Sequence, residues 1–362
     1  SAPATEQTRE AYMAALFAEI GGRAKDYSDR TVTSIFIGGG TPSLLSGEQI
    51  GQLMDRIREQ FAMAQDAEIT MEVNPGTASA EKLRNFYTAG INRLSIGMQS
   101  AQAEELKNLG RIHDFEGFCQ VYREAVEAGF TNINVDIMSG LPGQTLASYR
   151  DTLEKVLHLE PMPQHISAYS LIVEEGTPFA AMAERGELPL PEEETERAMY
   201  EETIEVLAKY GFHRYEISNY ARDGYECRHN VGYWIRRDYL GFGIGAASLI
   251  DNVRFQNEKS LGAYLAHPLE SREEEQTLTV QDRMEETMFL GLRLTRGVSC
   301  VDFAEQYGRT VEEVYGEVIA RNVADGLLTV TERKENQKKD RFLALTKRGL
   351  DLSNYVMAQF LF

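Results

Sequence analysis

The feature that most constrains the fold of this chain is a regular alternation of short apolar runs with amphipathic segments. Between residues 32 and 173, five runs rich in Ile and Val alternate with segments whose apolar residues recur at helical spacing. Such a series predicts parallel strands with helices packed outside the sheet. Five strands are too few for an eight-fold barrel, so we expect an α/β partial barrel or an open sheet. The expected strands are residues 32–38, 68–73, 91–100, 130–140 and 163–173.

The organisation changes after the fifth strand. An acidic, proline-containing stretch at 184–196 breaks the alternation, and an aromatic and glycine-rich region follows it. From about residue 277 the pattern predicts helix, short helix, helix, β-ribbon and terminal helix. We therefore expect a barrel core at 1–175, an extension of the barrel at 176–276, and a small winged-helix-like domain at 277–362.

Composition excludes several classes of protein. The net charge of −19 disfavours a nucleic-acid-binding protein whose affinity comes from phosphate contacts. We see neither a signal peptide nor an apolar run long enough for a membrane span, so we expect a cytoplasmic protein. The three cysteines, Cys119, Cys227 and Cys300, lie far apart and share no metal-ligand spacing. A metal or iron–sulfur site built from these cysteines alone is therefore not expected.

Polar or glycine-rich residues stand at the end of every predicted strand. Parallel α/β folds bind ligands at the carboxyl ends of their strands, so these residues are candidates for one site. Each also has a structural alternative: the glycines can form a tight turn, Glu72 can cap a helix, Gln99 can bridge a loop, and Arg111 can pair with a surface acid. Asp136 lies inside an apolar run, where an unpaired carboxylate is costly. The set comprises Gly38 to Thr41, Glu72, Asn74, Gln99, Ser100, Arg111, Asp136, Ser139, Gly140, Pro142, Gly143, Ser167, Tyr169 and Ser170.

The chemistry of this set selects a kind of ligand. Glycine amides can bind a small zwitterion, carboxylates an ammonium group or a ribose diol, and a guanidinium a carboxylate. S-adenosylmethionine (SAM) carries all of these groups. A phosphorylated metabolite, the ligand of a different class of barrel enzyme, would call for lysines that the set lacks.

The segments FIGGGTPSLL, ITMEVNPGT, INRLSIGMQS, LGRIHD and NVDIMSGLPGQT resemble the radical SAM family that includes oxygen-independent coproporphyrinogen III oxidase and the haem chaperone HemW. The resemblance implies a partial (β/α)6 barrel with SAM bound across the strand ends. The resemblance implies that Gly39, Gly40 and Thr41 hold the methionine amino group of SAM, and that Arg111 pairs with the SAM carboxylate. It also implies that Glu72 and Gln99 contact SAM and that Asp136 binds the ribose. Tyr169 and Leu171 are then expected near the adenosyl group.

One motif of this family is missing from the sequence. The family binds a 4Fe-4S cluster through a three-cysteine loop that follows the first strand and precedes a helix similar to residues 5–24. Both that strand and that loop are lacking here. We expect that they lie upstream of Ser1, and the alternative is that they have been lost.

The segment His229-Asn230-Val231-Gly232-Tyr233-Trp234 favours the chaperone branch. Haem requires apolar walls, stacking aromatics and an axial imidazole or thiolate. Cys227, His229, Tyr233 and Trp234 are therefore candidates for binding haem as cargo, although Tyr233 and Trp234 can also be core aromatics and His229 a loop cap. The resemblance implies haem-accepting respiratory proteins as partners, with contact at a membrane surface as an option. If the chain is instead an enzyme, we expect oxygen-independent decarboxylation of coproporphyrinogen III.

Overall fold

The computed structural model describes residues 5–270, 272–335 and 338–361. The chain divides into two compact units. One, the barrel unit, comprises Thr31–Arg214 and Ser218–Glu226. The other, the flanking unit, comprises Ser1–Arg30, Tyr215–Ile217 and Cys227–Phe362.

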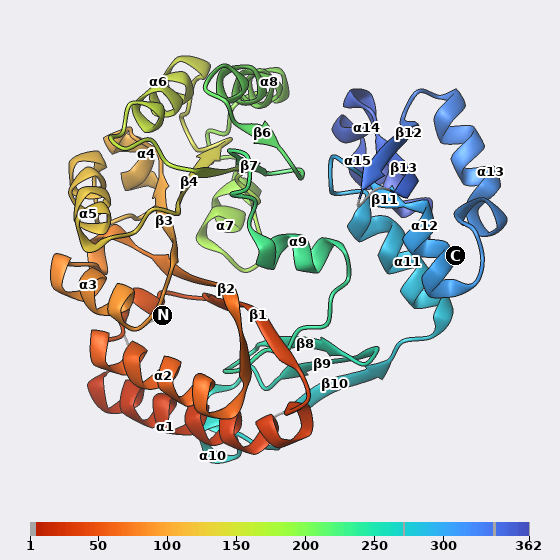
Figure 1. Cartoon of the computed structure of the whole chain (residues 1–362). Coiled ribbons are helices and arrows are strands. Elements are labelled where there is room, and N and C mark those ends of the chain that lie inside the picture. Colours follow the sequence, from red (N-terminus) through yellow and green to blue (C-terminus); the bar gives the residue numbers. More distant parts are fainter. Residues whose placement is uncertain (1–4, 271, 336–337, 362) are drawn as a thin grey trace. The chain divides into compact units, whose positions relative to one another are not determined.

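The barrel unit is built on a seven-stranded sheet in the order β1-β2-β3-β4-β5-β7-β6. The first five strands are parallel, and β7 and β6 complete the sheet in antiparallel orientation. The sheet curls, with helices on its outer side (Figure 1). The predicted partial barrel is thus confirmed, whereas the two antiparallel strands were not predicted. The strands are β1 Thr31–Ile37, β2 Ala62–Val73, β3 Arg93–Gln99, β4 Ile133–Ser139, β5 His165–Ser170, β6 His213–Arg214 and β7 Asn219–Ala221.

The helices of the barrel unit begin and end where short polar residues and glycines allow. Ser46 forms a capping box with Gln49 at the start of α2, and Asp114 accepts a hydrogen bond from Gly117 N at the start of α5. Gly129 ends α5 in the left-handed conformation. The helices are α2 Gly47–Gln60, α3 Ala80–Thr88, α4 Ala103–Asn108, α5 Phe115–Ala128, α6 Leu146–Leu157, α7 Pro178–Glu184 and α8 Glu193–Lys209, with 3-10 turns η2 Pro42–Leu44 and η3 Pro75–Thr77.

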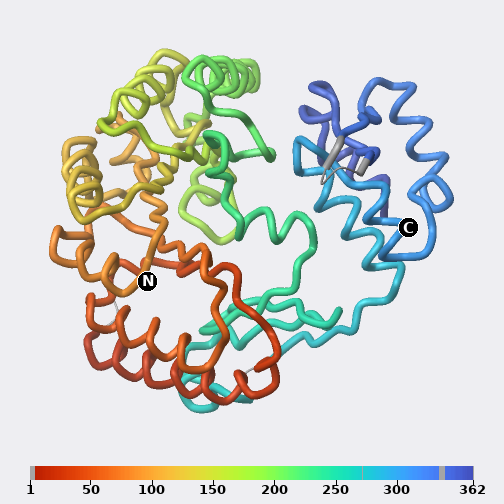
Figure 2. The backbone as a smooth tube through the Cα atoms, in the orientation of Figure 1, coloured from red at the N-terminus to blue at the C-terminus, as the bar shows by residue number. Residues whose placement is uncertain are grey.

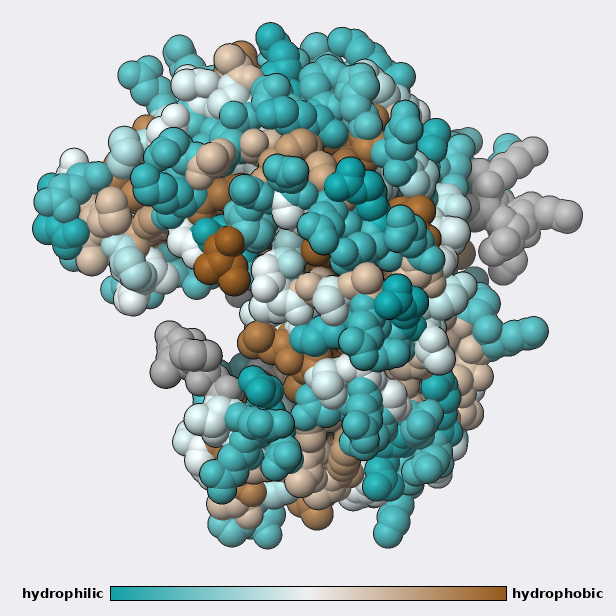
Figure 3. Space-filling view, turned by 90° about the vertical axis from the view of Figure 1, so that its left-hand side faces the viewer, coloured by the Kyte–Doolittle hydropathy of each residue, from teal (hydrophilic) through white to brown (hydrophobic). Residues whose placement is uncertain are grey.

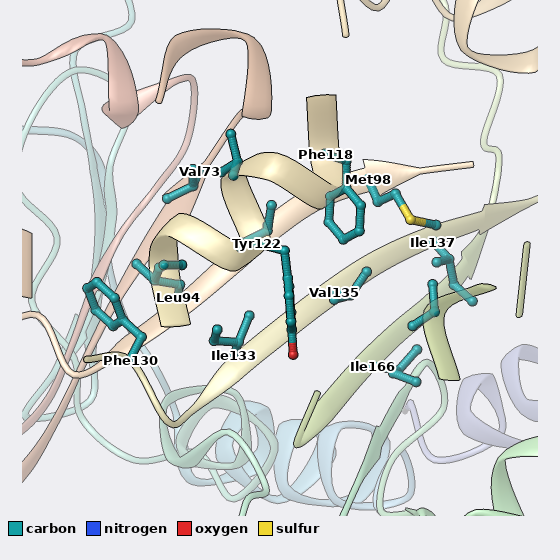
Figure 4. Packing of buried hydrophobic residues seen from close by; sticks show 14 of the residues in the cluster. Val73, Leu94, Met98, Phe118, Tyr122, Phe130, Ile133, Val135, Ile137 and Ile166 are labelled. Atoms are coloured by element: carbon teal, nitrogen blue, oxygen red, sulfur yellow. The ribbon is translucent and has the colours of Figure 1, made fainter. Parts of the chain in front are cut away.

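The core of the barrel unit lies between the sheet and its outer helices. Phe118 and Tyr122 of α5 point onto the sheet, where they meet apolar residues such as Val135 of β4 (Figure 4). The Tyr122 hydroxyl donates to the carbonyl of Pro161 at 2.7 Å, so its polar atom is satisfied. This packing fixes the strands and therefore the positions of the residues at their carboxyl ends.

In the flanking unit, the first helix is fastened to a small antiparallel sheet by a buried polar network. Glu19 of α1 is fully buried and accepts hydrogen bonds from Gly243 N at 2.8 Å, Asn257 Nδ2 at 2.7 Å and the Tyr264 hydroxyl at 2.7 Å. Arg23 pairs with the same carboxylate at 2.7 Å. Figure 2 traces how α1 and this later part of the chain lie together. The elements are α1 Glu6–Arg23, η1 Ala24–Tyr27, α9 Arg228–Trp234, β8 Ala247–Ile250, β9 Val253–Asn257, α10 Leu261–Ala266 and β10 Arg272–Thr277.

The C-terminal part of the flanking unit has a hydrophobic cluster of its own and a three-stranded sheet in the order β11-β13-β12. Its order of helices, β-ribbon and terminal helices matches the prediction of a small C-terminal domain. The elements are α11 Val280–Gly291, β11 Val298–Ser299, α12 Cys300–Tyr307, α13 Val311–Ala324, β12 Leu328–Glu335, β13 Lys338–Leu345, α14 Lys347–Asp351 and α15 Ser353–Ala358.

The surface shown in Figure 3 is mainly hydrophilic, with scattered apolar residues. Across the described ranges, every helix is too short or too polar to cross a lipid bilayer.

Removing a core side chain of β3 should destabilise the protein strongly. Ile96 is fully buried in the barrel core, whereas Ile172 is 77% exposed. We expect Ile96→Ala to lower the free energy of unfolding by about 2–5 kcal/mol, because it removes apolar contacts and leaves a cavity. The matched change Ile172→Ala should stay within about 0.5 kcal/mol of wild type. Urea unfolding followed by circular dichroism measures both; equal effects would contradict the packing described here.

Candidate functional site

The carboxyl ends of the five parallel strands bring the predicted residues to one edge of the sheet. Register places Glu72 of β2 opposite Ser95 of β3, and Asp136 of β4 opposite both Gly97 and Ser167. Tyr169 of β5 pairs with Met138 at the end of β4. Leu171 follows β5, and its amide donates to the carbonyl of Ser139 at 2.9 Å.

The glycines after β1 approach Glu72 closely. A Cβ at Gly38 would lie 2.8 Å from Glu72 Cδ, so a side chain there would collide with this carboxyl group. Gly39 has φ +81°, which favours glycine, and its amide donates to the Glu72 carboxylate. A Cβ at Gly39 or Gly40 would meet nothing within 4 Å. The backbone at these two positions therefore faces open space, and Thr41 leads from them into η2.

Glu72 and Asp136 form a pair of neighbouring carboxylates. Burial raises the pKa of Glu72, the nearby Asp136 raises it further, and the Gly39 amide opposes both effects. Burial also raises the pKa of Asp136, while hydrogen bonds from Asn134, Ser167 and Ser95 and the charge of Arg93 hold it down. Asn134 Nδ2 donates to Asp136 Oδ1 at 2.7 Å. A cationic or hydroxyl-bearing ligand between these carboxylates would relieve their repulsion.

Sequence reasoning named Ser167 but missed Asn134 and Ser95, which also support Asp136. Asn134 Nδ2 also donates to Ser95 Oγ at 2.7 Å, and Asn134 Oδ1 is bonded to His165 Nδ1 at 2.6 Å. His165 is fully buried, and burial holds its pKa well below the usual value, so the ring is neutral. The signal that could have found Asn134 is its place two residues before Asp136, which puts both side chains on one face of the strand.

Gln99, Tyr169 and Arg111 complete this edge of the sheet. The Tyr169 hydroxyl donates to Gln99 Oε1 at 3.0 Å. Burial raises the pKa of Tyr169, and the charges of Asp136 and Glu72 raise it further, while the charge of Arg111 lowers it. The Tyr169 phenol therefore lies within electrostatic range of all three charged groups. Among the described residues, the Arg111 guanidinium has no hydrogen-bond or ion-pair partner.

The residues present fit SAM. Two neighbouring carboxylates suit an ammonium group and a diol, and a guanidinium that has no ion-pair partner among the described residues suits a carboxylate. The exposed backbone of Gly39 and Gly40 leaves room for a close approach. By contrast, the described part of the chain contains no group of His, Cys, Asp or Glu that could hold a metal ion, so these residues do not fit an iron–sulfur cluster. All three cysteines are free thiols.

The candidate haem-binding residues lie on or beside α9 in the flanking unit. His229 Nε2 lies 3.2 Å from the Tyr233 hydroxyl, and the two rings meet edge to face at 4.9 Å. Tyr233 in turn contacts Tyr239 at 4.7 Å between ring centroids, a neighbour that sequence reasoning missed. Burial raises the pKa of Tyr233 to about 12, and Tyr239 and Cys227 add to the shift.

The structure does not gather all four candidates into one exposed group. Cys227 is fully buried. Trp234 lies beneath the Arg293 guanidinium, which is 4.3 Å from the ring centroid. Tyr233 is therefore the exposed member of the four, while His229 and Trp234 are half-buried.

Comparison with known proteins shows the family to which this chain belongs. The model of the radical SAM superfamily matches residues 4–156, and the model of the HemN C-terminal domain matches residues 278–352. The haem chaperone HemW of Bacillus subtilis (strain 168) is 38% identical over 98% of this chain and 92% of its own length. HemW of Lactococcus lactis (strain IL1403) is 35% identical over 99% of this chain and 91% of its own length.

Among solved structures, coproporphyrinogen III oxidase (HemN) from Escherichia coli, a radical SAM enzyme, superposes with a TM-score of 0.82 and 26% identity. The match covers 98% of this chain and 84% of the oxidase. The fold is therefore HemN-like, while the sequence is more similar to the HemW proteins. The chain belongs to the HemW family of the radical SAM superfamily.

Proposed function

We propose that this protein is a haem chaperone that binds haem and passes it to haem-requiring proteins such as those of the respiratory chain. The observation that carries the proposal is the similarity to HemW proteins over almost the full length of both chains. The lower identity to the oxidase, 26%, makes oxidation of coproporphyrinogen III the second candidate. That candidate is favoured only by the shared fold.

We propose the strand ends of the barrel unit as the SAM site. Gly39, Gly40 and Thr41 would approach the methionine amino group, with Glu72 as its counter-ion. Arg111 would pair with the carboxylate and Asp136 with the ribose hydroxyls. Gln99, Tyr169 and Leu171 would border the adenosyl group. In this superfamily, SAM supplies a 5′-deoxyadenosyl group when a cluster is present. The described residues offer that cluster no ligands, so we assign them only the binding and orientation of SAM.

We propose His229 as the haem-facing residue of the flanking unit. An imidazole is a common axial ligand of haem iron, and neighbouring tyrosine rings offer apolar faces. The contact with Tyr233 fixes the plane of the imidazole. Cys227 is less suited to be a ligand because its side chain is fully buried.

Two incubations distinguish chaperone from oxidase. In the first, the protein is mixed with haem, passed over a desalting column and assayed for haem as the pyridine haemochrome. In the second, protein that also carries the family's three-cysteine motif, with its 4Fe-4S cluster reconstituted without oxygen, is incubated with coproporphyrinogen III, SAM and a reductant, and the porphyrins are separated by chromatography. We expect stoichiometric retention of haem and no protoporphyrinogen. Turnover to protoporphyrinogen without retained haem would establish the oxidase instead.

The affinity for SAM should depend on pH through Glu72. The ionised carboxylate is the form that binds an ammonium group, and burial beside Asp136 raises the pKa at which that form is lost. As pH falls, SAM binding should therefore begin to weaken at a higher pH than it would if Glu72 had the pKa of an ordinary glutamate. Calorimetric titration with SAM across the acidic range measures this. Glu72→Gln should bind SAM more weakly and lose that part of the pH dependence; an unchanged profile in this variant would remove Glu72 from the site.

Substitution of His229 should affect haem and leave SAM alone. We expect His229→Ala to weaken haem binding by about tenfold or more, equivalent to at least about 1.4 kcal/mol, because an axial ligand is lost. The matched control is His267→Ala, which removes an exposed imidazole of the same unit. Haem titration followed by the Soret absorption compares the variants, and SAM titration confirms that the barrel unit is intact. A wild-type haem affinity in His229→Ala would exclude this residue as a ligand.

A further inference from the structure

The backbone of Gln99 is held in an uncommon conformation at the centre of the proposed SAM site. Gln99 is the last residue of β3 and has φ +70°, in the left-handed region that side chains other than glycine rarely adopt. The pairing of β3 with β4 shifts register between Gly97 and Gln99. This conformation carries the side chain to Tyr169, which donates to Gln99 Oε1. A strained backbone of this kind persists only where its surroundings enforce it.

Hydrogen bonds hold the chain on both sides of Gln99. Before it, the carbonyl of Met98 is bonded to Ser100 N at 2.9 Å and to His113 Nε2 at 3.3 Å. After it, Ser100 Oγ donates to Glu105 Oε2 at 2.6 Å, and Ala101 N donates to Thr152 Oγ1 at 3.2 Å. The backbone of Gln99 is therefore fixed between two anchored neighbours.

Glu105 is unusual among these anchors because it is a buried carboxylate that binds only neutral donors. It is 5% exposed and belongs to no ion pair within the described ranges. Besides Ser100, it accepts Ser148 Oγ at Oε1, 2.6 Å away, and Gln144 Nε2 at Oε2, 3.0 Å away. Burying a carboxylate without a cation is costly, so the three donors must compensate for it.

The orientation of Gln144 makes the carboxylate hard to replace. Gln144 Nε2 also donates to the carbonyl of Met138 at 3.1 Å, and Gln144 Oε1 accepts from Leu141 N at 3.2 Å. The amide therefore cannot flip without losing both bonds. A glutamine at position 105 has one acceptor oxygen in place of two, so at least one of the three donors would be left without its acceptor.

We propose that Glu105 is a positioning residue for SAM binding: by holding Ser100, it keeps Gln99 in the left-handed conformation that presents its side chain to the ligand. Glu105 ties the segment after β3 to Gln144 after β4 and to Ser148 of α6, and so fixes the edge of the site from behind. The proposal rests on the SAM site proposed above. It adds a residue that has no place among the SAM-contacting residues of that site.

The test is a double-mutant cycle read out by SAM binding. Wild type, Glu105→Gln, Gln99→Ala and the double variant are titrated with SAM by calorimetry, and thermal unfolding shows that each is folded. Glu104→Gln is the matched control, because Glu104 is the neighbouring glutamate with its side chain 81% exposed. We expect Glu105→Gln to weaken SAM binding by about tenfold and Glu104→Gln to change it by less than about twofold.

Coupling to Gln99 separates a positioning role from a merely structural one. If Glu105 acts through Gln99, the double variant should bind SAM less than about twofold more weakly than Gln99→Ala alone. In Gln99→Ala the side chain that Glu105 positions is already gone. The proposal would be overturned if Glu105→Gln lowered SAM affinity equally in wild type and in Gln99→Ala. It would also be overturned if Glu105→Gln bound SAM with wild-type affinity. Should Glu105→Gln fail to fold, Ser100→Ala removes the same contact from the other side and is interpreted in the same way.

Failure of the underlying site gives a different result. If wild type does not bind SAM, or if Gln99→Ala binds it as wild type does, the proposed SAM site is wrong at Gln99, and the role of Glu105 falls with it. If Gln99→Ala weakens binding while Glu105→Gln does not, the site stands and only the role of Glu105 is refuted.

Discussion

The proximity of Glu72 and Asp136 is the constraint on which the barrel unit's chemistry depends. These two carboxylates, on the strands that flank β3, repel each other, and burial makes the charged forms costlier still. Tyr169 lies within electrostatic reach of Arg111 as well as of both carboxylates. Among the described residues the Arg111 guanidinium has no ion-pair partner, so the SAM proposed for this site can present charges of both signs to it.

Sequence periodicity was sufficient for the parallel part of the sheet because those strands alternate with clear amphipathic helices, although β1 has no fully buried residue. It failed for β6 and β7, which have only two and three residues; β7 pairs with β5, more than forty residues earlier in the chain, and β6 pairs with β7. It also failed for β10, Arg272–Thr277, whose six residues are all exposed. Such a strand shows no alternation of apolar and polar residues, so only its pairing with β9 reveals it.

The same distinction applies to the candidate site. Residues at strand ends, such as Glu72 and Asp136, could be predicted because parallel strands all present their carboxyl ends at one edge. The left-handed backbone of Gln99 could not, because it depends on hydrogen bonds from segments that are distant in sequence. Nor could the contact between Tyr233 and Tyr239, because it depends on the path of the chain after α9. Of the residues predicted to bind haem because they are adjacent in sequence, Cys227 is buried and Trp234 lies beneath Arg293.

Three buried carboxylates, Glu19, Glu105 and Glu286, differ in their partners from the half-buried Glu72. Glu19 is satisfied by Arg23, Asn257, Tyr264 and the amide of Gly243. Glu286 pairs with Arg236 and Arg254. Glu105 is satisfied by three neutral donors. Glu72 has the Gly39 amide on one side and a second carboxylate on the other. Glu19, Glu105 and Glu286 thus have partners on both carboxylate oxygens, whereas Glu72 has no cation partner among the described residues, which is why we assign it to the ligand in the proposed SAM site.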